Sequence, residues 1–403
     1  MKTNNNIPAY RFQGYTDAWE LRKLGEVAEI ITGTTPSTFD EENYGGKRLF
    51  VSPVDIQDNR YITETLTTLT EKGHLLGREL RPGATLFVSI GSTIGKVAQL
   101  KDFATSNQQI NAVISGDKID DDFIFTGLEK KSTQIKNLSS QQAVPIINKS
   151  TFSKIEFEFP TLPEQKAIGT FFSTLDRQIT LHQRKLDTLK EQKKTYLKLL
   201  FPAKGQTKPA LRFQGFEDDW EEVKLGDVCT MQGGNAWKSD SYSLTGEYLV
   251  VTIANVTGEY FIDDKKGNRI DINPNEMQYV LKKGDILISL TGNVGRVSKM
   301  TESKGVLNQR VGKLMTIANF EFIFSILRTE KFENEMRLAS QGAAQANISN
   351  KDVLQYMISL PSLPEQEAIG IFFQTLDQEI SQVEDKLTSL KEMKKTLLRK
   401  LFV

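Results

Sequence analysis

The stretch LPEQKAIGTFFSTLDRQI at residues 162–179 recurs as LPEQEAIGIFFQTLDQEI at residues 363–380. The likeness extends outward, because RFQG at Arg11 recurs at Arg212. A repeat this long is not a solenoid, whose units span roughly 20–50 residues. The chain therefore contains two copies of a whole domain, each followed by a helix, and we expect it to act at two related places.

Both repeats continue in a heptad pattern typical of a coiled coil. Pro163 suits the first turn of a helix, and no further proline interrupts the first pattern before Pro202. Apolar and other seam residues alternate at spacings of four and three: Leu175, Ile179, His182, Leu186, Leu189, Lys193, Tyr196 and Leu200 in the first copy, and Leu376, Ile380, Val383, Leu387, Leu390, Lys394, Leu397 and Leu401 in the second. A seam this long needs a partner of similar length, which favours an antiparallel coiled coil between the copies. Packing of each helix on its own domain is the alternative.

The sequence outside the helices is β-rich. Segments such as LFVSPVDI and ATLFVSIGSTIGKVAQL combine β-branched residues with glycine and short polar turns, which indicates short strands and loops. The predicted organisation is a first β-rich domain at 1–161, a long helix at 162–204, a linker at 205–211, a second β-rich domain at 212–362 and a second long helix at 363–403. The expected fold class is α+β, with two β-rich domains related by pseudo-two-fold symmetry and separated by two long helices paired as an antiparallel coiled coil.

Composition narrows the class of protein further. The chain has 403 residues, enough for several domains, with 38% hydrophobic and 25% charged residues. Its formal net charge is zero, which leaves nucleic-acid binding open because binding depends on where charge is concentrated. The single cysteine, Cys229, excludes an intramolecular disulfide and suits a reducing compartment. We expect no signal peptide and no membrane span, because no apolar run approaches 18 residues.

A phosphate-binding loop is one tempting interpretation of GSTIGK at 91–96. The motif is one residue short of GxxxxGK[ST], has no Ser or Thr after the lysine, and becomes TGNVGR in the second copy. We therefore expect a tight turn between two strands, in which the glycines adopt positive φ.

Other candidate catalytic or metal-binding groups also have plainer interpretations. His74 and His182 are far apart and form no metal-ligand cluster with the single cysteine. Lys193 and Lys394 match half of a nuclease motif, but they lie on the helix seam, where a polar residue that sets register is expected. The acidic run at 120–122 has no counterpart in the second copy and is expected in a solvated loop. We therefore predict no catalytic residue and no metal site.

The repeated motifs resemble those of the specificity subunit of type I restriction–modification enzymes. The resemblance rests on the LPEQ-x-AIG-x-FF-x-TLD blocks at 162–176 and 363–377, on the helix ends of the form KKT-x-L-x-x-LF, and on RFQGF-x-DDWE at 212–221. It implies a non-catalytic subunit whose β-rich regions are target-recognition domains, each binding one half of a bipartite, asymmetric DNA sequence. It also implies that the helices set the spacing of the half-sites and dock two methyltransferase subunits, to which motor-nuclease subunits can be added.

The same resemblance implies that the chain binds no cofactor of its own. S-adenosylmethionine, ATP and magnesium would act at the partner subunits, in the cytoplasm of a bacterium or archaeon, with double-stranded DNA as the target and no membrane partner. Two other functions remain open: a non-catalytic coiled-coil scaffold whose β-rich domains bind proteins, and a self-sufficient restriction enzyme.

The glycine-bearing loops carry the polar residues that are candidates for DNA binding. Arg, Lys, Asn and Gln recognise base edges, whereas Lys, Arg, Ser and Thr also contact phosphates. The candidates are Thr34, Thr35, Lys47, Arg48, Ser92, Thr93, Lys96, Gln108 and Gln109 in the first domain, and Asn235, Trp237, Lys238, Asn293, Arg296, Gln309 and Arg310 in the second. Lys96 and Arg296 stand out because both copies keep a cation just after a glycine turn. For the NQQ and NQR segments at 107–109 and 308–310, a buried hydrogen-bonding role is an equal alternative.

Overall fold

The computed structural model describes residues 7–139, 145–203, 205–340 and 346–402. The chain forms two compact units: unit 1 comprises residues 1–184 and 385–403, and unit 2 comprises residues 185–384. The two long helices, α5 (Leu162–Leu199) and α10 (Leu363–Lys400), each contribute a segment to both units. The compact units therefore cut across the predicted linear boundaries, which give each helix a segment of its own.

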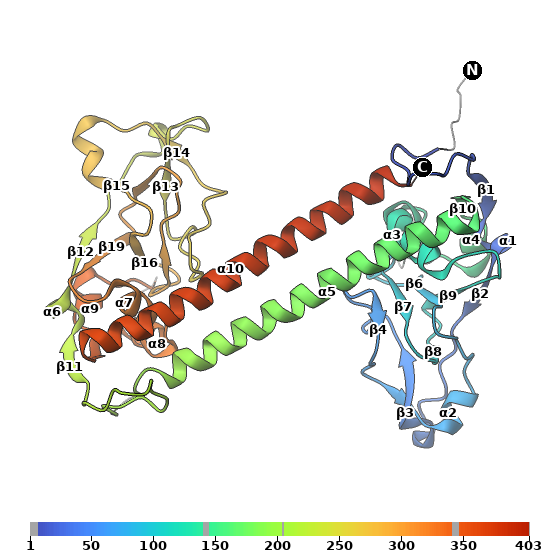
Figure 1. The fold of residues 1–403 in the computed structure, drawn as a ribbon, viewed down its shortest axis with the longest axis horizontal. Helices are drawn as coiled ribbons and strands as arrows, with labels where there is room; N and C mark the ends of the chain where they lie inside the picture. The colour runs from blue at the N-terminus through green and yellow to red at the C-terminus, as the bar shows by residue number, and fades with distance from the viewer. Residues whose placement is uncertain (1–6, 140–144, 204, 341–345, 403) are drawn as a thin grey trace. The chain divides into compact units, whose positions relative to one another are not determined.

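In each unit, a stretch of α5 lies beside a stretch of α10 (Figure 1). In unit 1, Lys394 contacts Asp176, and Lys391 donates to Gln183 over 3.3 Å. Residue numbers rise along α5 as they fall along α10, so the helices are antiparallel.

Unit 2 shows the same direction of pairing. Lys193 contacts Asp377, and the ring centroid of Tyr196 lies 5.0 Å from that of Phe372. Most seam side chains are buried: Leu175, Leu186, Leu189, Leu200, Leu376, Ile380, Val383, Leu387, Leu390 and Leu401. The remaining seam residues, Ile179, His182, Lys193, Tyr196, Lys394 and Leu397, are half-buried. The predicted antiparallel coiled coil is confirmed.

Unit 1 is built mainly from short strands. Its strands are β1 (Glu20–Lys23), β2 (Ala28–Thr32), β3 (Tyr44–Val51), β4 (Tyr61–Ile62), β5 (Thr68–Leu69), β6 (Thr85–Val88), β7 (Val97–Leu100), β8 (Ala104–Ser106), β9 (Ile110–Ser115) and β10 (Glu156–Phe159). Its shorter helices are α1 (Leu24–Val27), η1 (Glu41–Asn43), α2 (Glu71–Leu75), α3 (Asp121–Asn137) and α4 (Lys149–Ser153). A five-stranded sheet has the order β2-β9-β6-β7-β4, a three-stranded sheet the order β5-β3-β8, and β1 pairs with β10.

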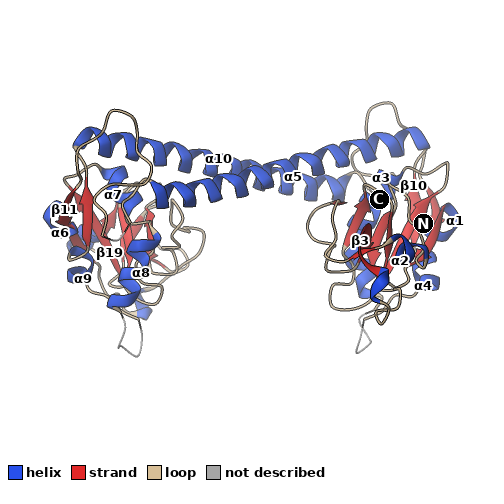
Figure 2. Cartoon of the chain, turned by 90° about the horizontal axis from the view of Figure 1, so that it is seen from below, coloured by secondary structure: helices blue, strands red, loops and turns tan. Residues whose placement is uncertain are grey.

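The central strand β6 explains how this unit is layered. All four of its residues are buried, as expected for an apolar run covered on both faces. Phe87 belongs to the core shared with the helices, whereas Leu86 and Val88 belong to a second core with residues of the three-stranded sheet. Figure 2 shows the strands of each unit grouped on one side of its helix segments.

Unit 2 repeats the plan. Its strands are β11 (Glu221–Lys224), β12 (Cys229–Gly233), β13 (Tyr248–Val251), β14 (Arg269–Ile270), β15 (Val280–Leu281), β16 (Ile286–Ser289), β17 (Val297–Lys299), β18 (Gly305–Leu307), β19 (Val311–Thr316) and β20 (Met357–Leu360). Its shorter helices are α6 (Leu225–Val228), η2 (Ser239–Ser241), η3 (Pro274–Tyr279), α7 (Phe320–Ile326), α8 (Glu330–Ala339) and α9 (Asn350–Leu354). The sheets have the orders β12-β19-β16-β17 and β14-β13-β18-β15, and β11 pairs with β20. The α+β class is confirmed.

The acidic run at 120–122 does not lie in a solvated loop, so that prediction is wrong. Asp120 caps the first turn of the 17-residue helix α3, an element that the β-rich interpretation missed. Asp121 pairs with Arg81, and Asp122 pairs with Arg60. Carboxylates in a first turn favour helix formation because they satisfy free N–H groups and complement the helix dipole.

The repeated LPEQ-AIG motif attaches each long helix to the domain that precedes it. In unit 1, both oxygens of Glu164 accept hydrogen bonds from Arg11 over 2.7 Å, which joins LPEQ to RFQG. The side chain of Gln165 accepts from the backbone N–H of Asp120 over 3.0 Å. A Cβ added to Gly169 would lie 2.3 Å from Asp120 Oδ1, so glycine lets α3 start against α5.

Unit 2 makes the same contacts with its own residues. Arg212 donates to both oxygens of Glu365 over 2.7 and 2.8 Å. Gln366 accepts from the backbone N–H of Asn319, the N-cap of α7, over 3.0 Å. The likeness between the motif copies is therefore explained in large part by packing of each helix on its own domain, which occurs together with the coiled coil.

An aromatic residue from the end of the other repeat's helix completes each core. In unit 1, the ring of Phe402 stacks on Phe123 at 5.3 Å and meets Trp19 edge-on at 6.0 Å. In unit 2, Phe201 stacks on Phe373 at 5.9 Å and meets Trp220 at 6.3 Å. Both helices thus end in an anchor that fills a core.

Candidate DNA interface

In unit 1, two loops lie together at one end of the strands of the five-stranded sheet. One follows β2 and carries Thr34 and Thr35, and the other precedes β9 and carries Gln108 and Gln109. The backbone N–H of Thr34 donates to Ser106 O over 2.8 Å, and the hydroxyl of Thr35 donates to the Gln108 side chain. Four of the predicted residues therefore share one surface.

The glycine hairpin, residues 89–96, connects β6 to β7 and lies at the same end of the strands. Its glycines have φ of +99° at Gly91 and +97° at Gly95, and their counterparts Gly292 and Gly295 have +70° and +79°. The strands that flank each turn are antiparallel. The predicted turn between two strands, with its glycines at positive φ, is confirmed.

The hairpin of unit 1 presents its polar side chains outward. Ser92 is exposed, whereas Thr93 and Lys96 are half-exposed. Lys96 Nζ donates to Gln57 Oε1 over 3.2 Å. The backbone N–H of Ser89 donates to the carbonyl of Gln109 over 2.8 Å, which joins the hairpin to the loop before β9.

Lys47 and Arg48 lie outside these loops, on strand β3 of the three-stranded sheet. Lys47 is exposed. Arg48 donates to both oxygens of Glu71 over 2.8 and 3.0 Å. The structure therefore does not bring these two residues together with the other candidates, and a DNA role for them stays a prediction.

The corresponding loops of unit 2 also meet. Asn235 accepts from the backbone N–H of Gln309 over 3.0 Å. Glu276 accepts from Asn235 Nδ2 over 3.3 Å and from Trp237 Nε1 over 2.7 Å. Hydrogen bonds to its carboxylate, first of all from the backbone of Asn273, hold the pKa of Glu276 below its ordinary value. The carboxylate of Glu276 therefore holds the first loop of unit 2 in place.

Four further candidates of unit 2, Lys238, Asn293, Gln309 and Arg310, are exposed. The Asn107 and Asn308 side chains stay local instead: Asn107 donates to Gln109 over 3.0 Å, and Asn308 accepts from the backbone N–H of Arg310 over 3.2 Å. The asparagines therefore make hydrogen bonds within the loops, and so does Gln109, whereas Gln108, Gln309 and Arg310 are exposed. A DNA role for these segments stays a prediction.

Arg296 lines a groove of about 870 Å³ between the last turns of α5 and the β-rich domain of unit 2. Within the described chain, its side chain has no hydrogen bond or ion pair, and the same holds for Lys198 and Lys331. The charged lining residues are Lys190, Lys193, Lys194, Lys198, Arg296, Arg328 and Lys331, against Glu259, Glu330 and Glu333. The groove therefore has a cationic wall that continues from the hairpin.

Sequence reasoning missed Gln57 and Glu276, which hold candidate side chains in place. Neither has a like residue at the matching position of the other copy, so the repeat gave no signal for them. His74 is buried with its Nε2 atom 2.8 Å from Glu79, and His182 Nδ1 contacts the Gln178 carbonyl over 2.8 Å. The described residues contain no cluster of three His, Cys, Asp or Glu side chains able to hold a metal ion. None of their helices combines the length and apolar character needed to cross a membrane.

Each of the two β-rich domains has three polar loops at one end of its strands, and each is attached to the paired long helices. This arrangement defines a recognition protein with two modules. A family model for the type I restriction modification DNA specificity domain matches residues 16–191 and again 217–392. The chain belongs to this family and is a type I specificity subunit, which is the non-catalytic component of such a system.

Similar proteins have the same description, over nearly the whole chain or over part of it. The type I restriction enzyme MjaVIII specificity subunit of Methanocaldococcus jannaschii is 25% identical over 398 residues, which cover 94% of this chain and 91% of the relative. The HindI specificity subunit of Haemophilus influenzae is 31% identical over 170 residues, 40% of this chain and 37% of the relative. The crystal structure of an S subunit from M. genitalium aligns with a TM-score of 0.70 at 17% identity, covering 98% of this chain and 99% of that one, and shows the same fold.

Proposed function

We propose that each recognition domain binds one half of a bipartite, asymmetric double-stranded DNA site, and that the coiled coil sets the spacing of the halves. One observation carries this proposal: the two units repeat the same three loops at one end of a sheet, yet most of the candidate base-binding residues on those loops differ. Thr34-Thr35 is replaced by Asn235-Ala236, and Gln109 by Arg310, whereas Gln108 is kept as Gln309. One scaffold with two different sets of base-binding side chains suits two unequal half-sites.

The helices would also dock two methyltransferase subunits, through which motor-nuclease subunits join the complex. S-adenosylmethionine, ATP and magnesium would then act at those partners, and this chain would use no cofactor, in the cytoplasm of its host. The exposed faces of α5 and α10 support such docking, since the seam and the LPEQ-AIG contacts occupy only their other faces.

A protein-binding scaffold is the alternative, and salt dependence separates the two. Neutralising each phosphate contact reduces the slope of log affinity against log salt by about 0.9. We expect Arg296→Ala, and likewise Lys96→Ala, to weaken binding of a random-sequence duplex and to reduce this slope by about one unit each. The measurement is a salt series of duplex binding by the complex of this chain with its methyltransferase subunit.

Lys282→Ala is the matched control, because Lys282 is exposed and lies just before β16, at the end of that strand opposite to the hairpin. It should leave both affinity and slope unchanged. If native complex binds duplex DNA with no salt dependence, or if neither loop variant differs from the control, these two cations have no role in DNA binding.

A further inference from the structure

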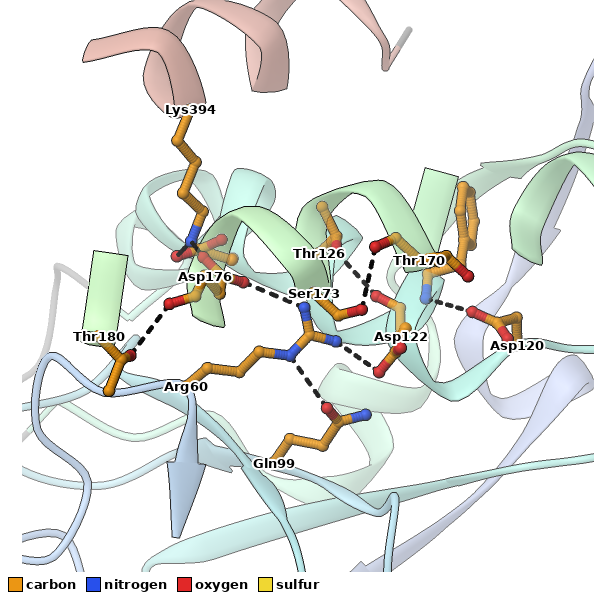
Figure 3. Close-up of polar contacts among 12 residues, drawn as sticks. Arg60, Gln99, Asp120, Asp122, Thr126, Thr170, Ser173, Asp176, Thr180 and Lys394 are labelled. Carbon is orange, nitrogen blue, oxygen red and sulfur yellow. Dashed lines mark hydrogen bonds and ion pairs between the residues drawn. The ribbon is translucent and has the colours of Figure 1, made fainter. Parts of the chain in front are cut away.

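A buried charge cluster in unit 1 joins the two long helices to Arg60 and Gln99 of the β-rich domain (Figure 3). Arg60 donates to Asp176 on α5 over 3.0 Å, to Asp122 on α3 over 2.6 Å and to Gln99 on β7 over 3.0 Å. Its side chain is only 1% exposed. Lys394 of α10 reaches the other oxygen of Asp176 over 2.6 Å and also pairs with Glu129 over 2.5 Å.

Unit 2 has a cluster at the same place with a different arrangement of charge. Asp377 and Lys193 repeat the helix pair, at 2.5 Å. The domain, however, supplies its cations from other positions. Lys299 pairs with Glu321 over 2.5 Å, and Arg328 pairs with Asp377 over 2.7 Å.

Backbone contacts establish which residues correspond. The N–H of Gln99 donates to the carbonyl of Arg60 over 2.7 Å, and the N–H of Lys299 donates to that of Tyr260 over 2.8 Å. Arg60 therefore corresponds to Tyr260, and Gln99 to Lys299.

The helix positions correspond in the same way. Asp120 and Asn319 are the N-caps of α3 and α7. Counting from these caps, Asp122 matches Glu321, and Glu129 matches Arg328.

The two clusters thus make the same kinds of ion pair with different residues. Both retain an Asp–Lys pair between the long helices, and in both a cation from the domain neutralises a carboxylate near the start of α3 or α7. In unit 1 three carboxylates face two cations, and in unit 2 two carboxylates face three cations. Buried charges of this kind are stabilising only as complete sets, because removing one member leaves another desolvated and unpaired.

In each unit, the charge cluster is close in the chain to the hairpin cation of the candidate interface. Gln99 lies on β7, whose first residue follows Lys96 directly, and Lys299 lies on β17, which follows Arg296 in the same way. In unit 1, the loop that carries Arg60 also supplies Gln57, the partner of Lys96. The position of each hairpin is therefore tied to the ends of the long helices.

We propose that the two clusters are interchangeable versions of one connection, which holds each recognition hairpin against the helix pair, and that Arg60 and Lys299 are its positioning residues. The hairpins' contact with DNA rests on the proposed function, but the connection itself does not. Arg60→Tyr introduces the unit 2 residue alone and removes a needed cation. Adding Gln99→Lys returns a cation at the position that unit 2 uses, within reach of Asp122 and of the Phe125 ring that Arg60 now covers.

The test is hydrogen–deuterium exchange of the full chain without DNA. Arg60→Tyr should raise the equilibrium constant for local opening of residues 88–100 by roughly a hundredfold or more, because breaking a buried ion pair is strongly destabilising. Exchange of the unit 2 peptides should not change. Arg60→Tyr with Gln99→Lys should recover most of that protection, even if the single variant fails to fold. Arg22→Tyr, at an exposed arginine of the same unit, is the control and should match the native chain.

Native-like protection of the hairpin in Arg60→Tyr, or a double variant no better than the single one, would overturn the proposal. Duplex binding by the same variants, measured in the complex with the methyltransferase subunit, is the separate readout. Loss and recovery of hairpin protection without any change in DNA binding would leave the connection standing and count against the proposed function of the hairpin.

Discussion

Phe402→Ala is expected to destabilise unit 1 by about 3–5 kcal/mol, the usual cost of deleting a buried phenyl ring and leaving a cavity. The ring is 7% exposed and contacts Phe123, Trp19 and Phe172. It comes from the end of the second repeat's helix but fills the core of the first repeat's domain. The effect should therefore be confined to unit 1, although the substitution lies at the far end of the sequence.

Hydrogen exchange under increasing urea measures this unit by unit. Peptides from α3 and β10 should lose protection, whereas those from α7 and β20 should not. Phe39→Ala is the matched control, because Phe39 is 99% exposed and makes no core contact. Equal behaviour of the two variants would show that Phe402 is not an anchor of unit 1.

The second large effect is expected from Asp377→Asn. This change leaves Lys193 and Arg328 in unit 2 without the carboxylate that both contact, with side chains only 13% and 6% exposed. Leaving buried cations unpaired costs about 3–5 kcal/mol. Unit 2 peptides should lose protection in urea, and Asp240→Asn, at an exposed aspartate of the same unit, should not change it.

Raising the pH should stabilise unit 2 of the native chain through Lys193. Burial, together with the charge of Arg328, lowers the pKa of Lys193 from 10.5 to about 8 despite the opposing effects of Asp377 and Glu259. Between these values the unfolded chain holds a proton that the folded chain has released, so stability rises with pH across this window. The urea midpoint of unit 2 should therefore increase from pH 8 to 10 more in the native chain than in Lys193→Met. Equal pH dependence in both would show that Lys193 titrates normally.

The parts of the fold that could be predicted from sequence are those set by local pattern. The heptad spacing gave the helices and their pairing, and Gly91 and Gly95 gave the hairpin turn, because each depends on residues close in the chain. Helix α3 was missed because only one acidic position of its first turn, Asp122, recurs in the second copy, as Glu321, so the run of three carboxylates is not repeated. The start of α7 carries Asn319 and Glu321 instead, which serve the same capping and pairing roles with different residues.

Contacts between distant segments could not be predicted in this way. The LF pair that ends each helix is plain in the sequence, but nothing there shows that Phe402 enters the first domain and Phe201 the second. The charge clusters are harder still, since Arg60 corresponds to Tyr260 and Gln99 to Lys299. Comparison of the copies finds identical residues, whereas these positions keep only the pairing of a cation from the domain with a carboxylate at the start of α3 or α7.

The central claim is that the two domains bind two different halves of one DNA site. The most direct measurement is methylome sequencing of a host that carries this chain with its partner subunits, before and after residues 212–362 are replaced by the matching domain of another specificity subunit. We predict adenine methylation at a split, asymmetric motif, of which the exchange alters one half and leaves the other half intact. A continuous motif, or an exchange that changes both halves together, would contradict the account.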